Sequence, residues 1–486
     1  MDSHTDPHHA RRWLILAVLG ISQLMVVLDA TIVNIALPSA QKALDFSTDS
    51  RQWIVTAYAL AFGSLLLLGG RISDLFGRKW TFVGGLVGFA VASAVGGAAQ
   101  GFGLLVTARA LQGVFGAILA PASLSLLTTT FSDPDERAKA FGVYGAIAGG
   151  GAAIGLLLGG VLTEYLSWRW CLYVNLVFAL PAAAAAVALL VNQAHPDKPR
   201  LDIPGTLTAS LGLLALVYGF SKAQTSGWGA GITLGCIAAS IVLLAAFVVL
   251  QRRVAHPLLP LRVVLDRNRG GSYLAVGLAG TGMFGVFLFL TYYLQQTLGF
   301  SPIKSGAAFL PMTAVIMIVA TTATTKVVPR VGSRPLVTSG MLLAALGMVL
   351  LTGLGVDSSY ASAVLPPLLV MGAGMGLVFA PAMSGATAGV AATDAGVASA
   401  MVNTAQQVGG SIGTALLSTM FTSAVSSAMA ANGHTPAAVA QATMHGYTTA
   451  FWWSAGIFLL GAVVCGLILP SGTHALDPAA EPALAH

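Results

Sequence analysis

Long apolar segments recur along this chain and restrict the folds open to it. Fourteen runs rich in Leu, Val, Ala and Gly are each long enough to cross a bilayer as a helix. Hydrophobic residues make up 56% of the 486 residues and charged residues only 8%, too little polar surface to cover a soluble globule. The sequence therefore predicts an all-α integral membrane protein.

The apolar runs also predict a topology. The expected helices span about 13–37, 52–69, 80–99, 104–127, 138–163, 170–191, 203–221, 230–250, 271–296, 303–325, 335–354, 362–388, 396–425 and 446–469, between polar tails at 1–12 and 471–486. This count places most basic loop residues on one side, which marks the cytoplasmic face. We expect a multi-pass protein of the cytoplasmic membrane with both termini inside. The basic residues expected outside are Lys42, Arg51, Arg169, Lys222 and Lys304.

Similar segments recur in the two halves of the chain in the same order. Residues 116–121 resemble 376–381, and 151–155 resemble 409–413. A nearly constant offset predicts two pseudo-symmetric six-helix bundles in parallel orientation, at 13–192 and 253–470. Residues 193–252 would then supply a linker and an inserted pair of helices. Chance similarity among Gly- and Ala-rich helices is the alternative.

A charged stretch with three glycines, residues 68–79, separates the second and third predicted helices. We predict a turn here that lets two helices fold back tightly and gates the cytoplasmic side. Asp74 would face a helix N-terminus or a nearby cation. A plain positive loop that only fixes orientation would explain the cations but not the acid. The predicted gate residues are Gly70, Arg71, Asp74, Gly77, Arg78 and Lys79.

One acid and one base are predicted to lie well inside spans. They are Asp29 and Arg109, roughly 12 Å and 8 Å below the outer ends of their helices at 1.5 Å per residue. An acid in hydrocarbon usually marks an ion or proton path, and Gln112 lies one turn from Arg109, where it can orient the guanidinium. A helix-capping acid or a permanent structural ion pair are the alternatives.

These segments together resemble a known family. The 70–79 turn, residues 28–38, the Arg109 to Gly113 segment and the glycines of the predicted fifth helix are similar to the fourteen-helix drug:proton antiporters of the major facilitator superfamily. The resemblance implies alternating access between two bundles, with Asp29 and Arg109 in proton coupling. One departure weakens the antiport part: Leu156 follows Gly155, where the family usually has proline.

Two further groups of residues are assigned to motion and to substrate contact. Gly151, Gly155, Gly159 and Gly160 would allow close helix approach and sliding as access alternates. Asn403, Gln406 and Gln407 share one helical face. Plain tight packing is the alternative for the glycines, and interhelical hydrogen bonding is the alternative for the three amides. The predicted cavity residues are Asn34, Phe284, Phe287, Thr291, Asn403, Gln406 and Gln407.

Several classes of function are excluded by missing motifs. The sequence has no phosphate-binding loop and no evident nucleophile with a base partner. It has no metal-ligand spacing among its three cysteines and no basic stripe for nucleic acid. We predict a monomeric, cofactor-free exporter of amphiphilic small molecules that is driven by the proton gradient and acts on protons and a small substrate within the bilayer. The alternatives are a proton symporter or uniporter for a metabolite, and a receptor that moves nothing.

Overall fold

The computed structural model describes residues 11–46, 48–131, 133–191, 202–433 and 435–472, and within these ranges it contains helices and no strand. Thirteen helices in this part of the chain are long and apolar enough to cross a membrane. A fourteenth, α5 (Pro134–Tyr165), has 32 residues and ends in the apolar stretch Ile154–Tyr165. The prediction of an all-α membrane fold is confirmed. The predicted tails at 1–12 and 471–486 lie mostly outside the described residues.

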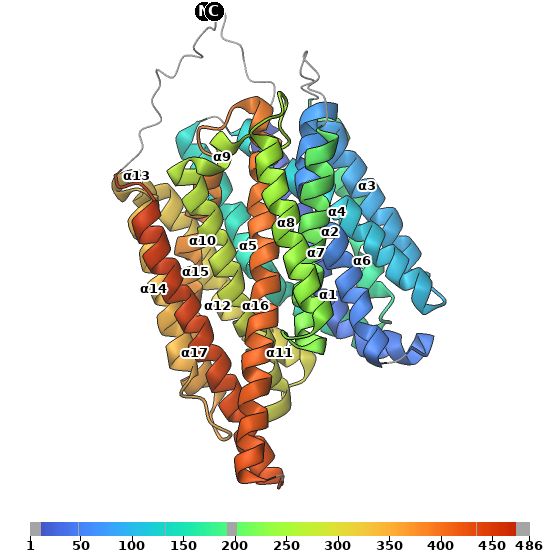
Figure 1. Cartoon of the computed structure of the whole chain (residues 1–486), viewed down its shortest axis with the longest axis vertical. Helices are drawn as coiled ribbons and strands as arrows, with labels where there is room; N and C mark the ends of the chain where they lie inside the picture. Colours follow the sequence, from blue (N-terminus) through green and yellow to red (C-terminus); the bar gives the residue numbers. More distant parts are fainter. Residues whose placement is uncertain (1–10, 47, 132, 192–201, 434, 473–486) are drawn as a thin grey trace, which may run out of the picture.

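The helices form two groups and a separate pair that lies over both of them (Figure 1). The first group, with α5, contains α1 (Arg12–Leu44), α2 (Thr48–Phe76), α3 (Arg78–Gly97), α4 (Phe102–Thr130) and α6 (Trp170–Leu189). The inserted pair is α7 (Ile203–Ser226) and α8 (Gly231–Gln251). A short helix, α9 (Leu261–Leu265), leads to the second group.

The second group repeats six crossings, several of them broken into segments. They are α10 (Arg267–Gly285) with the π-helical η2 (Val286–Leu290) and η3 (Tyr293–Thr297); α11 (Pro302–Ala308), α12 (Leu310–Thr322), η4 (Ala323–Val327) and α13 (Val328–Val331); α14 (Ser333–Leu351); η5 (Tyr360–Val364) with α15 (Leu365–Ala386); α16 (Ala395–Asn432), which follows the 3-10 turn η6 (Ala392–Asp394); and α17 (Pro436–Ile468). Helices α9 and α13 lie at one end of the molecule, and α11 lies at the other (Figure 1). We name these the α9 end and the α11 end.

Helix starts follow local capping chemistry. The Asp133 carboxylate accepts hydrogen bonds from the amides of Asp135 and Glu136 at the start of α5. Ser301 and Thr435 cap α11 and α17 in the same way, each followed by a proline at the first helical position. An oxygen that accepts from a free amide, followed by proline, is the usual way to begin a helix.

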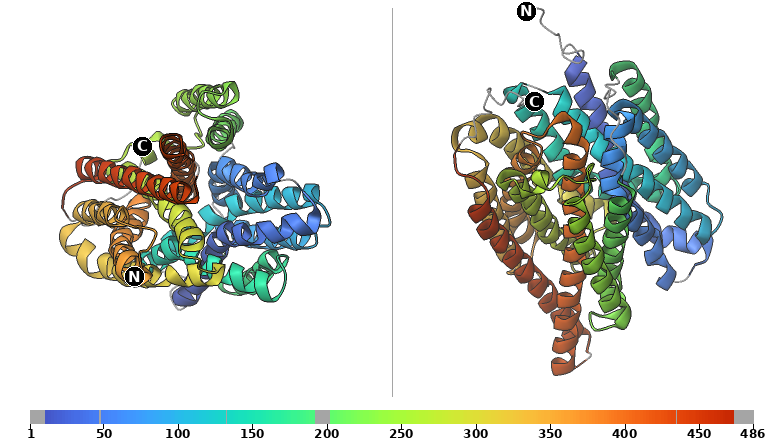
Figure 2. Two further views of the ribbon diagram at one scale, coloured as in Figure 1. Left: turned by 90° about the horizontal axis from the view of Figure 1, so that it is seen from below. Right: turned by 45° about the horizontal axis from the view of Figure 1, so that its top comes forward.

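The inserted pair lies against the outside of both groups (Figure 2). Near the α9 end, Leu213 of α7 belongs to one apolar cluster with Leu67 of α2 and Val397 of α16. Near the α11 end, the indole nitrogen of Trp228 donates a hydrogen bond to the Thr419 hydroxyl of α16 at 2.8 Å. Tyr218 of α7 packs against a ring of α2. Helix α7 therefore contacts both halves.

The predicted turn at 68–79 is wrong in its extent. Helix α2 continues to Phe76, and the chain reverses at Gly77 alone, which has a φ of 88° that favours glycine. Gly70 lies inside α2, where a Cβ would be 2.6 Å from the Gly396 carbonyl oxygen of α16. Gly70 therefore allows α2 and α16 to approach closely and does not form a turn. The charged residues that follow it extend α2 instead of ending it.

Several other helices are longer than predicted, mostly at the α11 end. Helix α1 runs to Leu44 rather than to residue 37, and α16 runs to Asn432 rather than to 425. Helix α17 begins at Pro436, ten residues before the predicted start at 446. Polar and small residues continue these helices past the apolar runs, so hydropathy alone missed them.

Glycines pack the helices in the same way in both groups. A Cβ on Gly151 of α5 would lie 2.9 Å from Val27 Cγ1 of α1. A Cβ on Gly409 of α16 would lie 2.1 Å from the Gly277 carbonyl oxygen of α10. Small residues at an interface let membrane helices approach closely. The repeat seen in the sequence is therefore also a repeat in packing.

Candidate functional site

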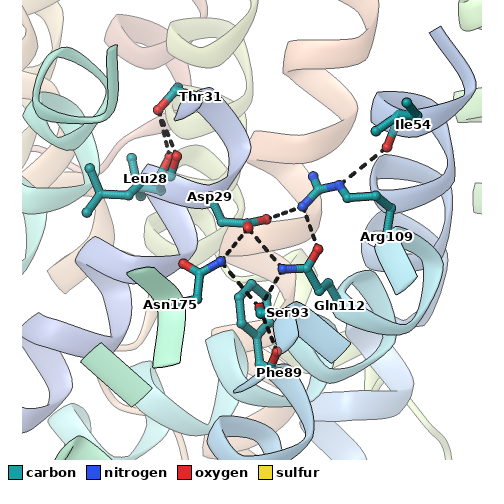
Figure 3. Close-up of polar contacts among 10 residues, drawn as sticks. Leu28, Asp29, Thr31, Ile54, Phe89, Ser93, Arg109, Gln112 and Asn175 are labelled. Carbon is teal, nitrogen blue, oxygen red and sulfur yellow. Dashed lines mark hydrogen bonds and ion pairs between the residues drawn. The ribbon is translucent and has the colours of Figure 1, made fainter. Parts of the chain in front are cut away.

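An acid and a base from different helices meet inside the first group (Figure 3). Arg109 Nη1 of α4 lies 2.6 Å from Asp29 Oδ2 of α1. The exposed fractions of the two residues are 1% and 0%. Two charges out of water are stable only when they are paired and fully hydrogen-bonded. The sequence predicted the two groups at the same depth, and the structure brings them into direct contact.

Three neutral side chains complete the hydrogen bonding around the acid. Gln112 Nε2 and Asn175 Nδ2 both donate to Asp29 Oδ1, at 3.0 and 2.7 Å. Gln112 also accepts from Arg109 Nη1 at 2.8 Å and donates to Ser93 Oγ at 2.6 Å. The Ser93 hydroxyl in turn donates to the Phe89 carbonyl at 2.7 Å. Gln112 therefore orients the guanidinium, as the sequence predicted.

The arginine is also held from the side of α2. Its Nε donates to the Ile54 carbonyl at 3.4 Å, and the guanidinium lies 4.4 Å from the centre of the Tyr58 ring. A ring face attracts a cation most strongly where water is absent. Helices α1, α2, α3, α4 and α6 all contribute to this site, which lies within one bundle.

An apolar cluster separates the site from the α11 end. Val33 and Leu37 of α1 pack with Leu105 of α4 and Trp168 at the start of α6, and all four are buried. These residues line a small pocket that reaches Arg109. Water that reaches the acid from this end must therefore pass apolar side chains.

The glycines of α5 lie against the stretch of α1 that carries Asp29. A Cβ on Gly155 would be 2.0 Å from Thr31 Oγ1, and one on Gly159 would be 2.9 Å from Ile32 Cγ1. Gly160 faces Ile303 of α11 in the other half. Leu156 is buried and α5 continues through it. The predicted packing role of these glycines fits the contacts, whereas sliding stays a prediction.

The predicted gate residues divide into two groups. Asp74 Oδ1 accepts from the Gly396 amide at 3.1 Å, so the carboxylate lies at the N-terminus of α16. Arg78 Nη2 is 3.9 Å from the same oxygen. Arg71 is also buried. Lys79 instead donates to the Val187 carbonyl of α6 at 2.8 Å, within its own bundle. Asp74 is the gate residue that bridges the halves.

The predicted cavity residues show mixed surroundings. Gln406 and Gln407 of α16 are half-buried, and no hydrogen bond engages their amides within the described part of the chain. Asn403 Nδ2 instead bonds the Ser399 carbonyl of its own helix. The Asn34 side chain lies outside the described residues.

The aromatic set of α10 and η2 is dispersed. Phe284 is 38% exposed, and Phe287 packs against Phe309 at a ring distance of 5.3 Å. The Thr291 hydroxyl is buried and has no hydrogen-bond partner among the residues described. Substrate contact through these three residues stays a prediction.

Sequence reasoning missed Asn175, Ser93 and Tyr58. Each is buried, and each contacts Asp29 or one of its partners. Asn175 is the only amide side chain within α6, and a polar group in a long apolar span was the available signal. No group of three His, Cys, Asp or Glu side chains in the described ranges could hold a metal ion.

Comparison with known proteins identifies the family. The family model described as Major Facilitator Superfamily matches residues 19–414. The chain belongs to the Major Facilitator Superfamily. It is therefore a transporter and not an enzyme, as the sequence predicted.

This member of the superfamily is similar to resistance and export proteins. It is 51% identical over 469 residues to the puromycin resistance protein pur8 of Streptomyces alboniger, covering 96% of this chain and 93% of the relative. It is 36% identical to the cephamycin export protein CmcT of Amycolatopsis lactamdurans, covering 95% and 93%. Among solved structures, the proton:xylose symporter XylE matches with a TM-score of 0.64 and 16% identity, covering 96% and 97%. That last likeness shows the fold alone.

Proposed function

We propose that this chain exports amphiphilic small molecules, antibiotics among them, across the cytoplasmic membrane in exchange for protons. The observation that carries the proposal is the Asp29–Arg109 pair, enclosed in the first bundle with four neutral partners. A buried acid in a membrane span, held by hydrogen bonds that can rearrange, suits proton binding and release. The puromycin and cephamycin relatives make antibiotics the first compounds to test.

The orientation follows from charge. The α9 end carries Arg71 and Arg78 at the end of α2 and the start of α3, and Arg267 at the start of α10. Basic residues next to membrane helices favour the cytoplasmic side. The α9 end would therefore face the cytoplasm, with both termini inside. The protein would act as a monomer without a bound cofactor.

Coupling would run through α1. Among the described residues, the hydrogen bonds to the Asp29 side chain come from within the first bundle, so a substrate between the bundles need not touch the acid. Thr31, two residues further along α1, faces Gly155 of α5. Protonation of Asp29 weakens its bond to Arg109, and α1 can then shift along the glycine face of α5. The Asp74 contact with Gly396 would open and close with that motion.

The available energy is adequate for export. A potential of about 100 mV contributes about 2.3 kcal/mol for each charge moved, and one pH unit adds about 1.4 kcal/mol. One proton for each substrate molecule then sustains a gradient of a few hundredfold. With Asp29 as the one group that carries the proton, this is the economical stoichiometry.

The test uses inside-out membrane vesicles with an imposed pH gradient and puromycin as the probe. An exporter accumulates the probe when the vesicle interior is acidic, and Asp29→Asn abolishes this accumulation at normal expression. Accumulation in the opposite direction would instead identify a symporter. Persistent pH-driven accumulation by Asp29→Asn would remove the proposed mechanism, and probe binding without any flux would indicate a receptor.

A further inference from the structure

A buried amide in α6 contacts the acid at the centre of the site. Asn175 is 1% exposed, and its Nδ2 lies 2.7 Å from Asp29 Oδ1 and 3.3 Å from Ser93 Oγ (Figure 3). An amide without partners in an apolar span is unfavourable by several kcal/mol. Its position is therefore explained by the acid it binds, and no residue of α6 was assigned to proton handling above.

In each hydrogen bond described for its side chain, Asp29 is the acceptor. Arg109 donates to Oδ2, and Gln112 and Asn175 donate to Oδ1. An ionised carboxylate only accepts, so the arrangement suits the charged acid. A protonated acid must donate one hydrogen bond, but each described group that bonds the Asp29 carboxylate does so through an N–H. One partner must become an acceptor when the proton binds.

Two of the three partners are poorly placed to change. A guanidinium has no acceptor atom, which excludes Arg109. The Gln112 amide is engaged at both ends, by Arg109 at its oxygen and by Ser93 and Asp29 at its nitrogen. Among the described residues, no hydrogen bond engages the amide oxygen of Asn175. A half-turn of this amide places its oxygen where its nitrogen now lies.

We propose that Asn175 is the positioning residue for proton exchange: its amide donates to ionised Asp29 and turns to accept from the protonated acid. The incoming proton passes from a hydronium ion of the solvent to Oδ1: one O–H bond of the hydronium breaks, the O–H bond of the carboxylic acid forms, and a water molecule is left. The inference rests on the proposed function, because it takes Asp29 as the group that carries the proton.

The other groups around the acid leave this role open. The charged and titratable neighbours are Arg109 of α4, Tyr58 of α2 and Cys171 of α6. Helix α3 contributes Ser93, and residues 146–160 of α5 contain no titratable side chain. Asn175 itself does not titrate, so any effect of replacing it on proton binding acts through Asp29.

The test is an infrared titration of the purified full-length protein, following the carboxyl C=O band that disappears in Asp29→Asn. Asn175→Leu removes a charge-assisted bond to the ionised acid and a weaker neutral bond to the protonated acid. Because the first is roughly twice as strong, we expect the titration midpoint to rise by about one pH unit. The C=O band should also change frequency, since its hydrogen-bond acceptor is gone.

Two further variants make the result decisive. Asn175→Ser keeps a group that both donates and accepts, so its midpoint should return towards the wild-type value; it also carries the test if the leucine variant does not fold. Asn268→Leu is the matched control, because the Asn268 amide bonds the Gly385 carbonyl in the second bundle. Its midpoint should equal that of the wild type.

The two hypotheses can fail separately. An unchanged midpoint and band position in Asn175→Leu overturn the role of Asn175 and leave proton coupling through Asp29 intact. An equal shift in Asn268→Leu also overturns it, because the effect would then be unspecific. If Asp29→Asn still transports puromycin against a pH-imposed gradient in vesicles, the proposed function fails and this inference fails with it.

Discussion

The two bundles share a packing scheme but differ in charge. In the first, Gly155 of α5 meets Thr31 of α1; in the second, Gly413 of α16 meets the Thr281 backbone of α10. The repeat pairs Arg109, which is 1% exposed, with Leu369, which is 37% exposed. The shared scheme provides two bodies that can move against each other. The difference shows that, within the described residues, the Asp29–Arg109 pair has no counterpart at the matching position of the second bundle.

The largest effect is expected from breaking the buried pair. Arg109→Leu leaves Asp29 as an uncompensated buried charge, which should reduce stability by about 3–5 kcal/mol and abolish transport. The double variant Asp29→Asn with Arg109→Leu should regain most of the stability and none of the proton-driven transport. Thermal unfolding of the purified protein measures the first quantity, and vesicle accumulation measures the second. If Arg109→Leu is as stable as the wild type, the ion pair is not shielded from water.

The next effect separates the glycines of the two bundles. A Cβ on Gly413 would lie 2.4 Å from the Thr281 carbonyl oxygen, which moves only with α10. Gly413→Ala should therefore destabilise by about 1–3 kcal/mol. Gly155→Ala meets the Thr31 hydroxyl, which can rotate, so it should destabilise less but slow transport through α1.

Thermal unfolding and transport rates, measured together, test this pair of glycine variants. Gly410→Ala is the matched control, since nothing lies within 4 Å of its Cβ position. Equal losses of stability at Gly413 and Gly410 would show that the close approach does not matter.

A smaller effect is expected where the first bundle meets α16. Asp74→Asn replaces the carboxylate at the Gly396 amide with a neutral group and should weaken the contact by about 1 kcal/mol. A change of about 1 kcal/mol lowers the ratio of molecules with this contact closed to those with it open about fivefold. Spin-label distances between α2 and α16 measure the two populations.

The second bundle supplies the comparison for the Asp74 variant. The matching turn near Gly332 holds no acid, and Arg334 there contacts Ser471. Arg334→Gln should therefore leave the α2–α16 distances unchanged. Unchanged distances in Asp74→Asn would mean that this carboxylate does not hold the halves together.

The smallest effect is expected at an ion pair whose cation lies at the surface. Arg262 pairs with Asp394 at 2.6 Å; the Asp394 side chain is 6% exposed, but the arginine side chain is 72% exposed. Exposed pairs contribute little and are screened by salt, so Arg262→Gln should change stability by less than about 0.5 kcal/mol. Unfolding at low and high salt tests this. A loss comparable to that in Arg109→Leu would show that burial is not what distinguishes the two pairs.

The sequence predicted the crossings and the depth of the charged groups because both depend on local composition. Asp29 and Arg109 stood out as charges in apolar runs, and counting residues from the helix ends placed them in one layer. The sequence could not show Asn175 or Ser93 at the same point, since their contacts depend on how α3 and α6 pack against α1.

The errors also have physical causes. Residues 68–79 read as a loop because they are charged, yet Arg71 and Asp74 are buried where α2 meets its neighbours. Tertiary contacts can shelter charge and extend a helix beyond its apolar run. The bond from Lys79 to α6 was not predicted either, because spacing along the chain does not show which neighbour a long side chain reaches.

The position of α7 has a consequence for any rocking motion. A helix that touches both halves cannot travel rigidly with each of them. The turn after α7 is joined to α16 by the Trp228–Thr419 hydrogen bond, which is directional. The contacts of α7 with α2 are apolar and aromatic, through Leu67 and through Tyr218 against Trp53, and such contacts depend less on exact geometry. We expect the inserted pair to move together with the second bundle and to slide along α2. Spin-label distances between α7 and α16 should then stay constant during turnover, while those between α7 and α2 vary. The reverse result would show that the inserted pair moves with α2.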